Sequence, residues 1–141
     1  MSNSNYRTVG ILEEDHVREL HALYQGEWWT RGRSLDEVQE MIDGTDHVFA
    51  LVTDPGGQLA AFARVLTDGV FKGLVFDVIV APGFRDQGLG RRLMDCIISH
   101  PTLRRVKHLE LYCLPELVPF YEKWGFSTDV SGVTFLRRMS G

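Results

Sequence analysis

One stretch of the 141-residue chain constrains the fold more than any other. Residues 71–80, FKGLVFDVIV, are apolar almost throughout, which is typical of a β-strand covered on both faces. After a turn, residues 90–99, GRRLMDCIIS, place apolar side chains at helical intervals, and residues 106–113, VKHLELYC, alternate as a strand does. A strand, a helix and a strand in this order predict a parallel pair of strands joined by a right-handed crossover.

The remaining elements predict antiparallel strands and further helices around this unit. The segment SLDE, beginning at Ser34, is a capping-box pattern and indicates the start of a helix. The turn DPGG separates two strand-like segments and predicts a hairpin. All expected elements lie at residues 6–11, 14–25, 34–44, 47–53, 58–66, 71–80, 90–99, 106–113, 116–124 and 133–138, with one more strand near 126–129 as an alternative. The sequence therefore predicts one α/β domain over residues 1–141, with a mixed sheet and helices on both faces.

Composition excludes several classes of function. The formal net charge of −4 argues against a nucleic-acid partner, because such proteins present a large basic face. No apolar run approaches membrane-spanning length, so we expect no membrane partner. Cys96 and Cys113 form no CxxC pattern, and the five histidines lack the spacing of metal ligands. With no secretory segment, we expect a cytoplasmic protein without a bound metal.

The segment FRDQGLGRRL, residues 84–93, predicts a phosphate-binding turn. A chain that enters a helix through glycines exposes backbone N–H groups, and Arg85 and Arg91 add positive charge there. A side chain at Gly88 or Gly90 would keep a pyrophosphate at a distance. The pattern is not a P-loop, because a P-loop needs Lys-Ser/Thr after its second glycine and this sequence has two arginines there. It is not the dinucleotide fingerprint G-x-G-x-x-G either, because this sequence has leucine in place of the third glycine. The alternative is that the glycines only shape a tight turn.

At this point the chain resembles a known family. The segment VIVAPGFRDQGLGRRLM is similar to the coenzyme-A signature R/Q-x-x-G-x-G/A of the GNAT (Gcn5-related N-acetyltransferase) superfamily, with Arg85, Gly88 and Gly90 at the signature positions. The segment FYEKWGF, residues 120–126, resembles the second hallmark of that family, and the element order matches from residue 6 to the end. Within the family, the chain is similar to small bacterial and plant arylalkylamine-type acetyltransferases. The resemblance implies a GNAT fold: a central mixed, mostly antiparallel sheet of six to seven strands, about four helices, and splayed parallel strands at the cofactor site.

The resemblance also implies how the cosubstrate acetyl-CoA binds, without a metal. The backbone of Val78, Ile79 and Val80 is expected to pair with the pantetheine arm as if it were an added strand. The turn is expected to hold the pyrophosphate through Arg85, Asp86, Gln87, Gly88, Leu89, Gly90 and Arg91.

Two residues are expected to carry the chemistry. Tyr121 matches the family tyrosine that protonates the departing coenzyme-A thiolate, and the alternative is packing beside Phe120 and Trp124. Asp77 places a carboxylate in a strand expected to be buried, so it needs a partner, a water molecule or a raised pKa. Asp77 is the candidate general base, and the alternative is a structural role at a β-bulge.

The expected reaction is acetyl transfer from acetyl-CoA to a primary amine by direct attack. Trp28 and Trp29, with Tyr24, are expected to bind the acceptor, or else to form a hydrophobic staple between helices. We expect Cys113 to fill space rather than to act as a nucleophile, because no histidine is spaced to activate it. We expect a small-molecule amine as partner and leave a homodimer open. A non-catalytic sensor of acyl-CoA is the alternative function.

Overall fold

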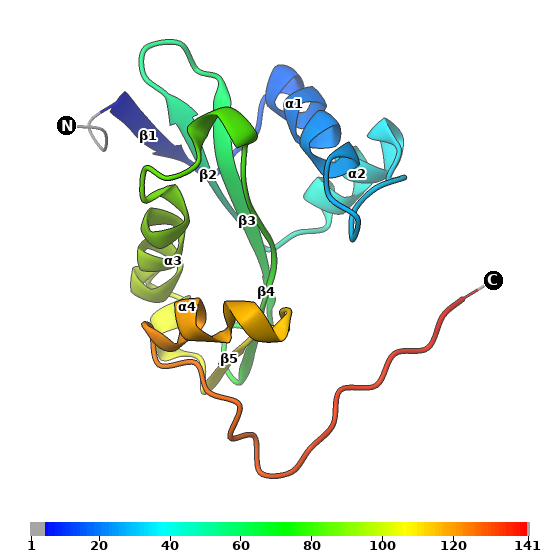
Figure 1. The fold of residues 1–141 in the computed structure, drawn as a ribbon, viewed down its shortest axis with the longest axis vertical. Coiled ribbons are helices and arrows are strands. Elements are labelled where there is room, and N and C mark those ends of the chain that lie inside the picture. Colours follow the sequence, from blue (N-terminus) through cyan, green and yellow to red (C-terminus); the bar gives the residue numbers. More distant parts are fainter. Residues whose placement is uncertain (1–4, 141) are drawn as a thin grey trace. The chain divides into compact units, whose positions relative to one another are not determined.

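The computed structural model describes residues 5–140 and divides the chain into two compact units, one ending at Leu111 and the other beginning at Tyr112 (Figure 1). The first unit contains β1 (Tyr6–Val9), α1 (Glu14–Gln25), α2 (Leu35–Asp43), β2 (His47–Thr53), β3 (Leu59–Thr67), β4 (Lys72–Val80), the 3-10 helix η2 (Pro82–Phe84), α3 (Leu89–Ser99), the 3-10 helix η3 (Leu103–Arg105) and β5 (His108–Glu110). The second unit contains the 3-10 helix η4 (Pro115–Leu117) and α4 (Val118–Glu122). That residues 1–141 form a single domain stays a prediction.

The five strands of the first unit form one sheet in the order β1-β2-β3-β4-β5, counted over residues 5–140. Strands β1 to β4 are antiparallel neighbours, and β4 and β5 are parallel, as the crossover through α3 requires. The parallel pairing runs only from Lys72 opposite His108 to Leu74 opposite Glu110. Beyond Leu74, β4 continues to Val80 with a described neighbouring strand only on the β3 side.

Helices cover both faces of this sheet. Figure 1 shows α1 and α2 on one face and α3 on the other. Helix α1 turns Leu20 and Tyr24 toward the sheet, where they join Phe62 of β3 in the core. On the opposite face, α3 buries Leu93, Met94 and Ile97 completely. These two apolar layers fix the position of β4 between them.

The start of α2 confirms the capping box expected from the sequence. The Ser34 hydroxyl accepts a hydrogen bond from the backbone N–H of Glu37 at 3.1 Å, and the Glu37 carboxylate accepts from the N–H of Ser34 at 2.9 Å. Gly44 follows the last helical residue and its N–H reaches the carbonyl of Glu40, which closes the helix.

Three expectations about strands are wrong. The strand expected at 106–113 is only β5, and within residues 5–140 the sheet has five strands rather than six to seven. Residues 133–138 and 126–129 form no strand: the second unit, as far as it is described, contains no strand for them to pair with. Burial along β4 alternates, with Val75 and Ile79 buried and Val78 and Val80 only half-buried, so this strand is not equally covered on both faces.

The structure of residues 5–140 bears on two expectations, that of a membrane span and that of a metal site. No helix in this range is both long and apolar enough to cross a bilayer. Within the same range, no three histidine, cysteine, aspartate or glutamate side chains gather as a metal would require.

Candidate functional site

A β-bulge interrupts the pairing of β3 with β4 at Asp77. Phe62 lies opposite Ile79, but Arg64 lies opposite Phe76, so β4 carries one residue more than β3 in this interval. The backbone accommodates the extra residue at Asp77, which has a φ of 58°. This is the left-handed conformation, which few residues other than glycine adopt. The bulge sets the direction of the Asp77 side chain and of the strand end that follows it.

Three donors converge on a single oxygen of Asp77. Its Oδ2 accepts hydrogen bonds from the Tyr24 hydroxyl at 2.9 Å, from Nη1 of Arg33 at 2.8 Å and from Nε of Arg64 at 2.8 Å. The side chain is only 5% exposed, yet none of the described residues donates a hydrogen bond to Oδ1. We call Asp77, Tyr24, Arg33 and Arg64 the Asp77 cluster. The cluster fixes the carboxylate and leaves one of its oxygens as an acceptor.

The charge state of Asp77 follows from this cluster. Burial raises the pKa of the carboxyl, but the hydrogen bonds and charges of Arg33 and Arg64 outweigh it and hold the pKa below its ordinary range. Asp77 is therefore ionised at neutral pH. A carboxylate with a lowered pKa is a weak proton acceptor, which weighs against a general base and favours a group that binds or orients a cation. The base role of Asp77 stays a prediction.

Tyr24, which the sequence offers as an acceptor-binding residue, has a fully buried side chain, and its acceptor-binding role stays a prediction. The ring packs edge-on against Phe62 with 6.4 Å between centroids, and the Arg33 guanidinium lies 4.6 Å above it. Burial raises the pKa of the hydroxyl above its usual value, and the Asp77 charge adds to this rise. The helical spacing that puts Tyr24 on the same face as Val17 and Leu20 explains its position.

Residues 26–33, which we call the tryptophan loop, carry Trp28 and Trp29 outward between α1 and α2. The Trp28 side chain is 68% exposed and that of Trp29 is 39% exposed, so neither closes the core as a staple would. The loop is anchored at its far end, where the buried Thr30 hydroxyl donates to the carbonyl of Tyr24 at 2.9 Å. An acceptor-binding role for the two indoles stays a prediction.

The glycine turn places the start of α3 in the open. Gly88 is the residue before the helix, with a φ of 77°, and no side chain caps the helix at this point. A Cβ added to Gly88 would meet no atom within 4 Å, so the left-handed backbone, rather than lack of space, calls for glycine here. Leu89 is buried, so only its backbone can face a ligand. The uncapped N–H groups of this first turn suit an anion.

The side chains of the turn differ in what they contact. Gln87 accepts a hydrogen bond from the Tyr6 hydroxyl, and the Arg92 guanidinium donates to the Tyr6 carbonyl at 3.2 Å, so the turn is tied to β1. Asp86 and Arg91 are exposed. Arg85 points back along β4, where its Nε donates to the Val80 carbonyl at 3.0 Å.

Arg85 also connects the turn with the tryptophan loop. Its Nη2 lies 3.1 Å from Oε2 of Glu27, in an ion pair that is partly open to solvent. One guanidinium therefore links three places: the end of β4, the glycine turn and the loop after α1.

The last residues of β4 offer backbone groups rather than side chains. Ile79 is 5% exposed and faces the core, whereas Val78 and Val80 are half-buried. Because pairing with β5 ends at Leu74, the β5-facing edge of these residues is open within the first unit. Such an edge can pair with an extended ligand.

The second unit holds Tyr121 in an aromatic cluster. Its ring lies 5.0 Å from that of Phe120 and 6.1 Å from that of Phe126, both edge-on. Burial, with a smaller effect from Cys113, raises the pKa of Tyr121 to about 12, so the phenol carries its proton at neutral pH. Burial and Glu116 raise the pKa of Cys113 as well, and a protonated thiol is a poor nucleophile.

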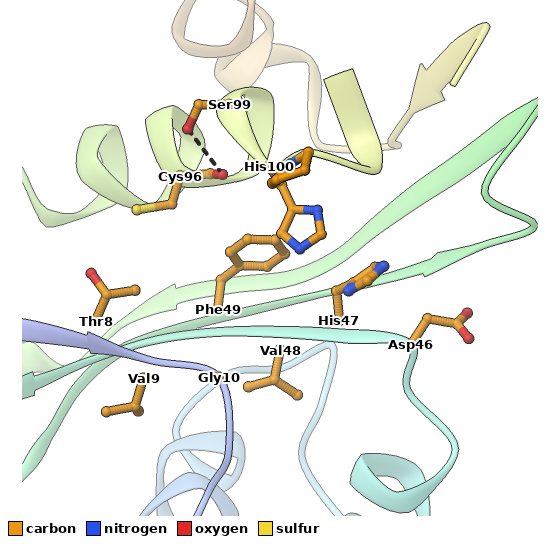
Figure 2. Close-up of a pocket in the computed structure, with 11 residues that line it drawn as sticks. Thr8, Val9, Gly10, Asp46, His47, Val48, Phe49, Cys96, Ser99 and His100 are labelled. Atoms are coloured by element: carbon orange, nitrogen blue, oxygen red, sulfur yellow. Dashed lines mark hydrogen bonds between the residues drawn. The ribbon is translucent and has the colours of Figure 1, made fainter. Parts of the chain in front are cut away.

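A separate cleft of about 450 Å³ contains none of the expected site residues. Figure 2 shows His47 and Phe49 of β2 facing His100 at the end of α3, with Thr8 and Val9 on β1 nearby. The two histidine rings lie 4.4 Å apart between centroids. This cleft is therefore distinct from the region around Asp77 and Arg85.

Comparison with known proteins decides the family. Residues 12–137 match the family model of the acetyltransferase (GNAT) domain, which is most of the chain. The chain belongs to the GNAT acetyltransferase family. It is 38% identical over 132 residues to serotonin N-acetyltransferase 2 of rice, a match that covers 92% of the chain and 62% of the rice protein. The GNAT chain thus spans less than two thirds of the length of this relative, and the same holds for two further curated N-acetyltransferases.

Solved structures agree with this GNAT assignment. A GNAT-family protein from Xanthomonas campestris superposes with a TM-score of 0.82 at 26% identity, over 96% of the chain and 93% of that protein. An aminoglycoside N-acetyltransferase in complex with coenzyme A shares the fold, with a TM-score of 0.65 at 18% identity over 96% and 94% of the two chains. GNAT acetyltransferases use acetyl-CoA, and the open β4 edge followed by an uncapped helix start fits an extended, phosphate-bearing ligand.

Sequence reasoning missed two residues of this region, Arg33 and Arg64, and it missed the pairing of Glu27 with Arg85. Arg64 could have been noticed, because a guanidinium amid the apolar residues of LAAFARVL needs a buried anion as partner. Arg33 and Glu27 lie in a loop of charged residues and glycines, where no local pattern distinguishes a partner of Asp77 or Arg85 from a solvated side chain.

Proposed function

We propose that the protein is an N-acetyltransferase that transfers the acetyl group of acetyl-CoA to a primary amine by direct attack. Two observations carry the proposal: the pairing of β4 with β5 ends at Leu74, before Val78–Val80, and the start of α3 after Gly88 has no side-chain cap. Family membership supports it. An extended arm with amide groups suits the strand edge, and a diphosphate suits the helix start, better than a compact ligand would.

In this proposal, acetyl-CoA supplies an activated thioester when it is bound. The backbone of Val78 to Val80 holds the pantetheine arm, and the backbone of Gly88 to Gly90 holds the pyrophosphate. The exposed side chains of Arg85 and Arg91 add positive charge, and Asp86 and Gln87 shape the turn. Backbone N–H groups at the end of β4 polarise the thioester carbonyl.

The proton transfers balance the reaction. A neutral amine forms the new C–N bond as the C–S bond breaks, and Tyr121 donates its proton to the departing sulfur. Burial keeps Tyr121 protonated throughout the neutral range, so its proton is available, although the raised pKa also makes the phenol a weaker acid than a solvated tyrosine. Before the attack, Asp77 accepts one proton from the ammonium form of the amine, directly or through water. Because the pKa of Asp77 is lowered, it does so only if the site also lowers the pKa of the amine. The second proton, which the nitrogen loses as the amide forms, passes through water to the Tyr121 phenolate and restores the phenol.

The proposed acceptor is a small amine with an aromatic or alkyl group. The exposed indoles of Trp28 and Trp29 offer apolar and cation-binding faces, and the carboxylate of Asp77 offers one free oxygen. The name of the rice relative, which is 38% identical, supports placing arylalkylamines first among the candidates.

Release of coenzyme A in the presence of amines tests the proposal. The protein is incubated with acetyl-CoA and with serotonin, tryptamine, polyamines, amino acids, a lysine-containing peptide or an aminoglycoside, and free thiol is titrated over time. Amine-dependent thiol release is expected. Tight acetyl-CoA binding with an intact thioester over hours, and no turnover with any amine, would instead indicate a non-catalytic sensor of acyl-CoA.

A further inference from the structure

We propose that Glu27 is a positioning residue that competes with the cofactor pyrophosphate for Arg85, and so couples acetyl-CoA binding to the tryptophan loop. The inference rests on the proposed function, since it takes the glycine turn as the pyrophosphate site. It goes beyond that function, because it assigns a role to Glu27 and predicts an order of binding.

The Arg85 side chain has two partners within the protein. Its Nε donates to the carbonyl of Val80 and its Nη2 to the carboxylate of Glu27. Neither partner belongs to the turn at Gly88, since Val80 ends β4 and Glu27 lies in the tryptophan loop. An anion at the turn therefore meets a guanidinium that a carboxylate partly neutralises.

The competition is electrostatic and does not depend on how far Arg85 moves. If the Arg85 guanidinium turns to the phosphate, its ion pair with Glu27 breaks. If it keeps Glu27, two anions share one guanidinium and repel each other. In both cases the negative charge of Glu27 lowers the affinity for the cofactor.

The size of the effect follows from exposure. The Glu27 side chain is 26% exposed and that of Arg85 is 50% exposed, so the pair is screened by water and ions. Exposed ion pairs of this kind are weak, which corresponds to a change of about two- to five-fold in the dissociation constant. A weak pair suits this role, because the cofactor can break it readily.

Breaking the pair alters the tryptophan loop without unfolding it. The carbonyl of Glu27 accepts from the N–H groups of Thr30 at 3.2 Å and Arg31 at 2.9 Å, so the backbone at Glu27 stays fixed when its side chain is released. Glu27 directly precedes the exposed Trp28 and Trp29 in the loop, and a loop that carries a free carboxylate and exposed indoles suits an ammonium group. Acetyl-CoA thereby prepares the loop for a cationic amine, and by linkage the amine strengthens cofactor binding.

Calorimetric titration with coenzyme A tests the competition. Glu27→Gln removes the charge and keeps the shape, and we expect its dissociation constant to fall about two- to five-fold at low salt, with the difference shrinking at high salt. Glu14→Gln is the matched control, because it makes the same change in a surface pair with Arg18 at 2.9 Å on α1, and it should bind as the wild type does. Equal or weaker binding by Glu27→Gln would overturn the inference while the proposed function stands. No binding by any of the three proteins would overturn the proposed function itself.

The indole N–H signals of Trp28 and Trp29 test the coupling. In a ¹⁵N-labelled protein, coenzyme A should shift these signals in the wild type and in Glu14→Gln, and much less in Glu27→Gln, where the pair no longer exists. Unchanged melting temperatures would show that the variants remain folded. Equal shifts in all three proteins would contradict the coupling.

Discussion

Asp77 combines two properties that are rarely found in one carboxylate: it is almost completely buried, and it is surrounded by more positive than negative charge. Arg33 and Arg64 both bind it, so the Asp77 cluster carries an excess of one positive charge. Such an excess lowers the pKa of a nearby ammonium group, because it favours the neutral amine. The cluster can therefore assist deprotonation of an acceptor even though Asp77 itself is a weak base.

Replacing Asp77 separates its structural and chemical roles. Asp77→Asn leaves two guanidiniums without their counter-ion, and we expect the free energy of unfolding to fall by about 2–4 kcal/mol, slightly less than for fully buried pairs because Arg33 is partly exposed. Urea unfolding measures this loss. If Asp77 also takes the proton of the amine, the rate of acetyl transfer should fall most at low pH and recover partly at high pH. A rate defect independent of pH would leave Asp77 with a structural role only.

Tyr121 allows a cleaner test. Tyr121→Phe keeps the edge-on packing with Phe120 and Phe126 and removes only the hydroxyl. If Tyr121 is the general acid, kcat should fall about 10²-fold or more, while the dissociation constant of acetyl-CoA changes little. Steady-state kinetics together with calorimetry would show this. A variant with nearly full kcat would mean that Tyr121 only fills the aromatic cluster.

At the scale of single elements, α3 depends on its two glycines for different reasons. Gly88 has a φ of 77°, so Gly88→Ala should cost about 1–2 kcal/mol of stability even though its Cβ has room. Gly90 is already helical, and Gly90→Ala should preserve or raise stability. Gly90→Val adds bulk and should weaken coenzyme-A binding. Thermal unfolding of the three variants measures the stability effects, and calorimetry measures coenzyme-A binding. If Gly90→Val bound coenzyme A normally, the assignment of the pyrophosphate site to this turn would be wrong.

How far the sequence predicts an element depends on how local its cause is. The helices at α1 and α2 follow from apolar spacing and from the Ser34–Glu37 capping box, which act within one turn of chain. The strand expected at 133–138 fails because alternation of apolar residues supplies no backbone partner, and pairing is a property of distant segments. The lone carboxylate of Asp77 in an apolar strand made a bulge one alternative, but the register of that bulge is set by the pairing of β4 with β3.

The candidate site shows the same limit. The glycine turn was predictable because the backbone demand on Gly88 is local, and the helical spacing of Tyr24 with Val17 and Leu20 is a local signal for its burial. Arg33 is separated from Asp77 by 44 positions, and only the folded sheet brings the two together.

At the scale of the whole molecule, the stability should depend on pH through His100. Its ring packs against His47 and Phe49, and burial, with a further effect of His47, lowers its pKa. Its Nδ1 accepts a hydrogen bond from the N–H of Thr102 at 3.1 Å, which protonation of Nδ1 would break. Asp46, at the other end of the same cleft, is the acidic side chain among the residues that line it.

The sign of this dependence follows from proton binding. Because the pKa of His100 is lower in the folded protein than its unfolded value of about 6.5, the unfolded chain binds more protons, and stability falls as the pH drops below about 7. His100→Phe keeps an aromatic ring in the same place and should flatten this dependence between pH 7 and 5. The lowered pKa of Asp77 adds a second loss of stability only below about pH 4. Melting temperatures recorded across pH test both ranges, and identical slopes for the wild type and His100→Phe would exclude His100.

The short pairing of β4 with β5 has one more consequence, for self-association. Within the first unit, no described strand lies beside Val75–Val80 on the β5 side, and backbone N–H and C=O groups on an unpaired strand edge can template another molecule. A ligand lying along this edge would occupy these groups and, by mass action, also raise the melting temperature. On gentle heating, light scattering should begin at a higher temperature with coenzyme A than without it. The increase in this onset temperature should be larger than the increase in melting temperature that coenzyme A causes. In that case the cosubstrate would also protect this protein from aggregation, and its supply would influence how long the protein stays monodisperse.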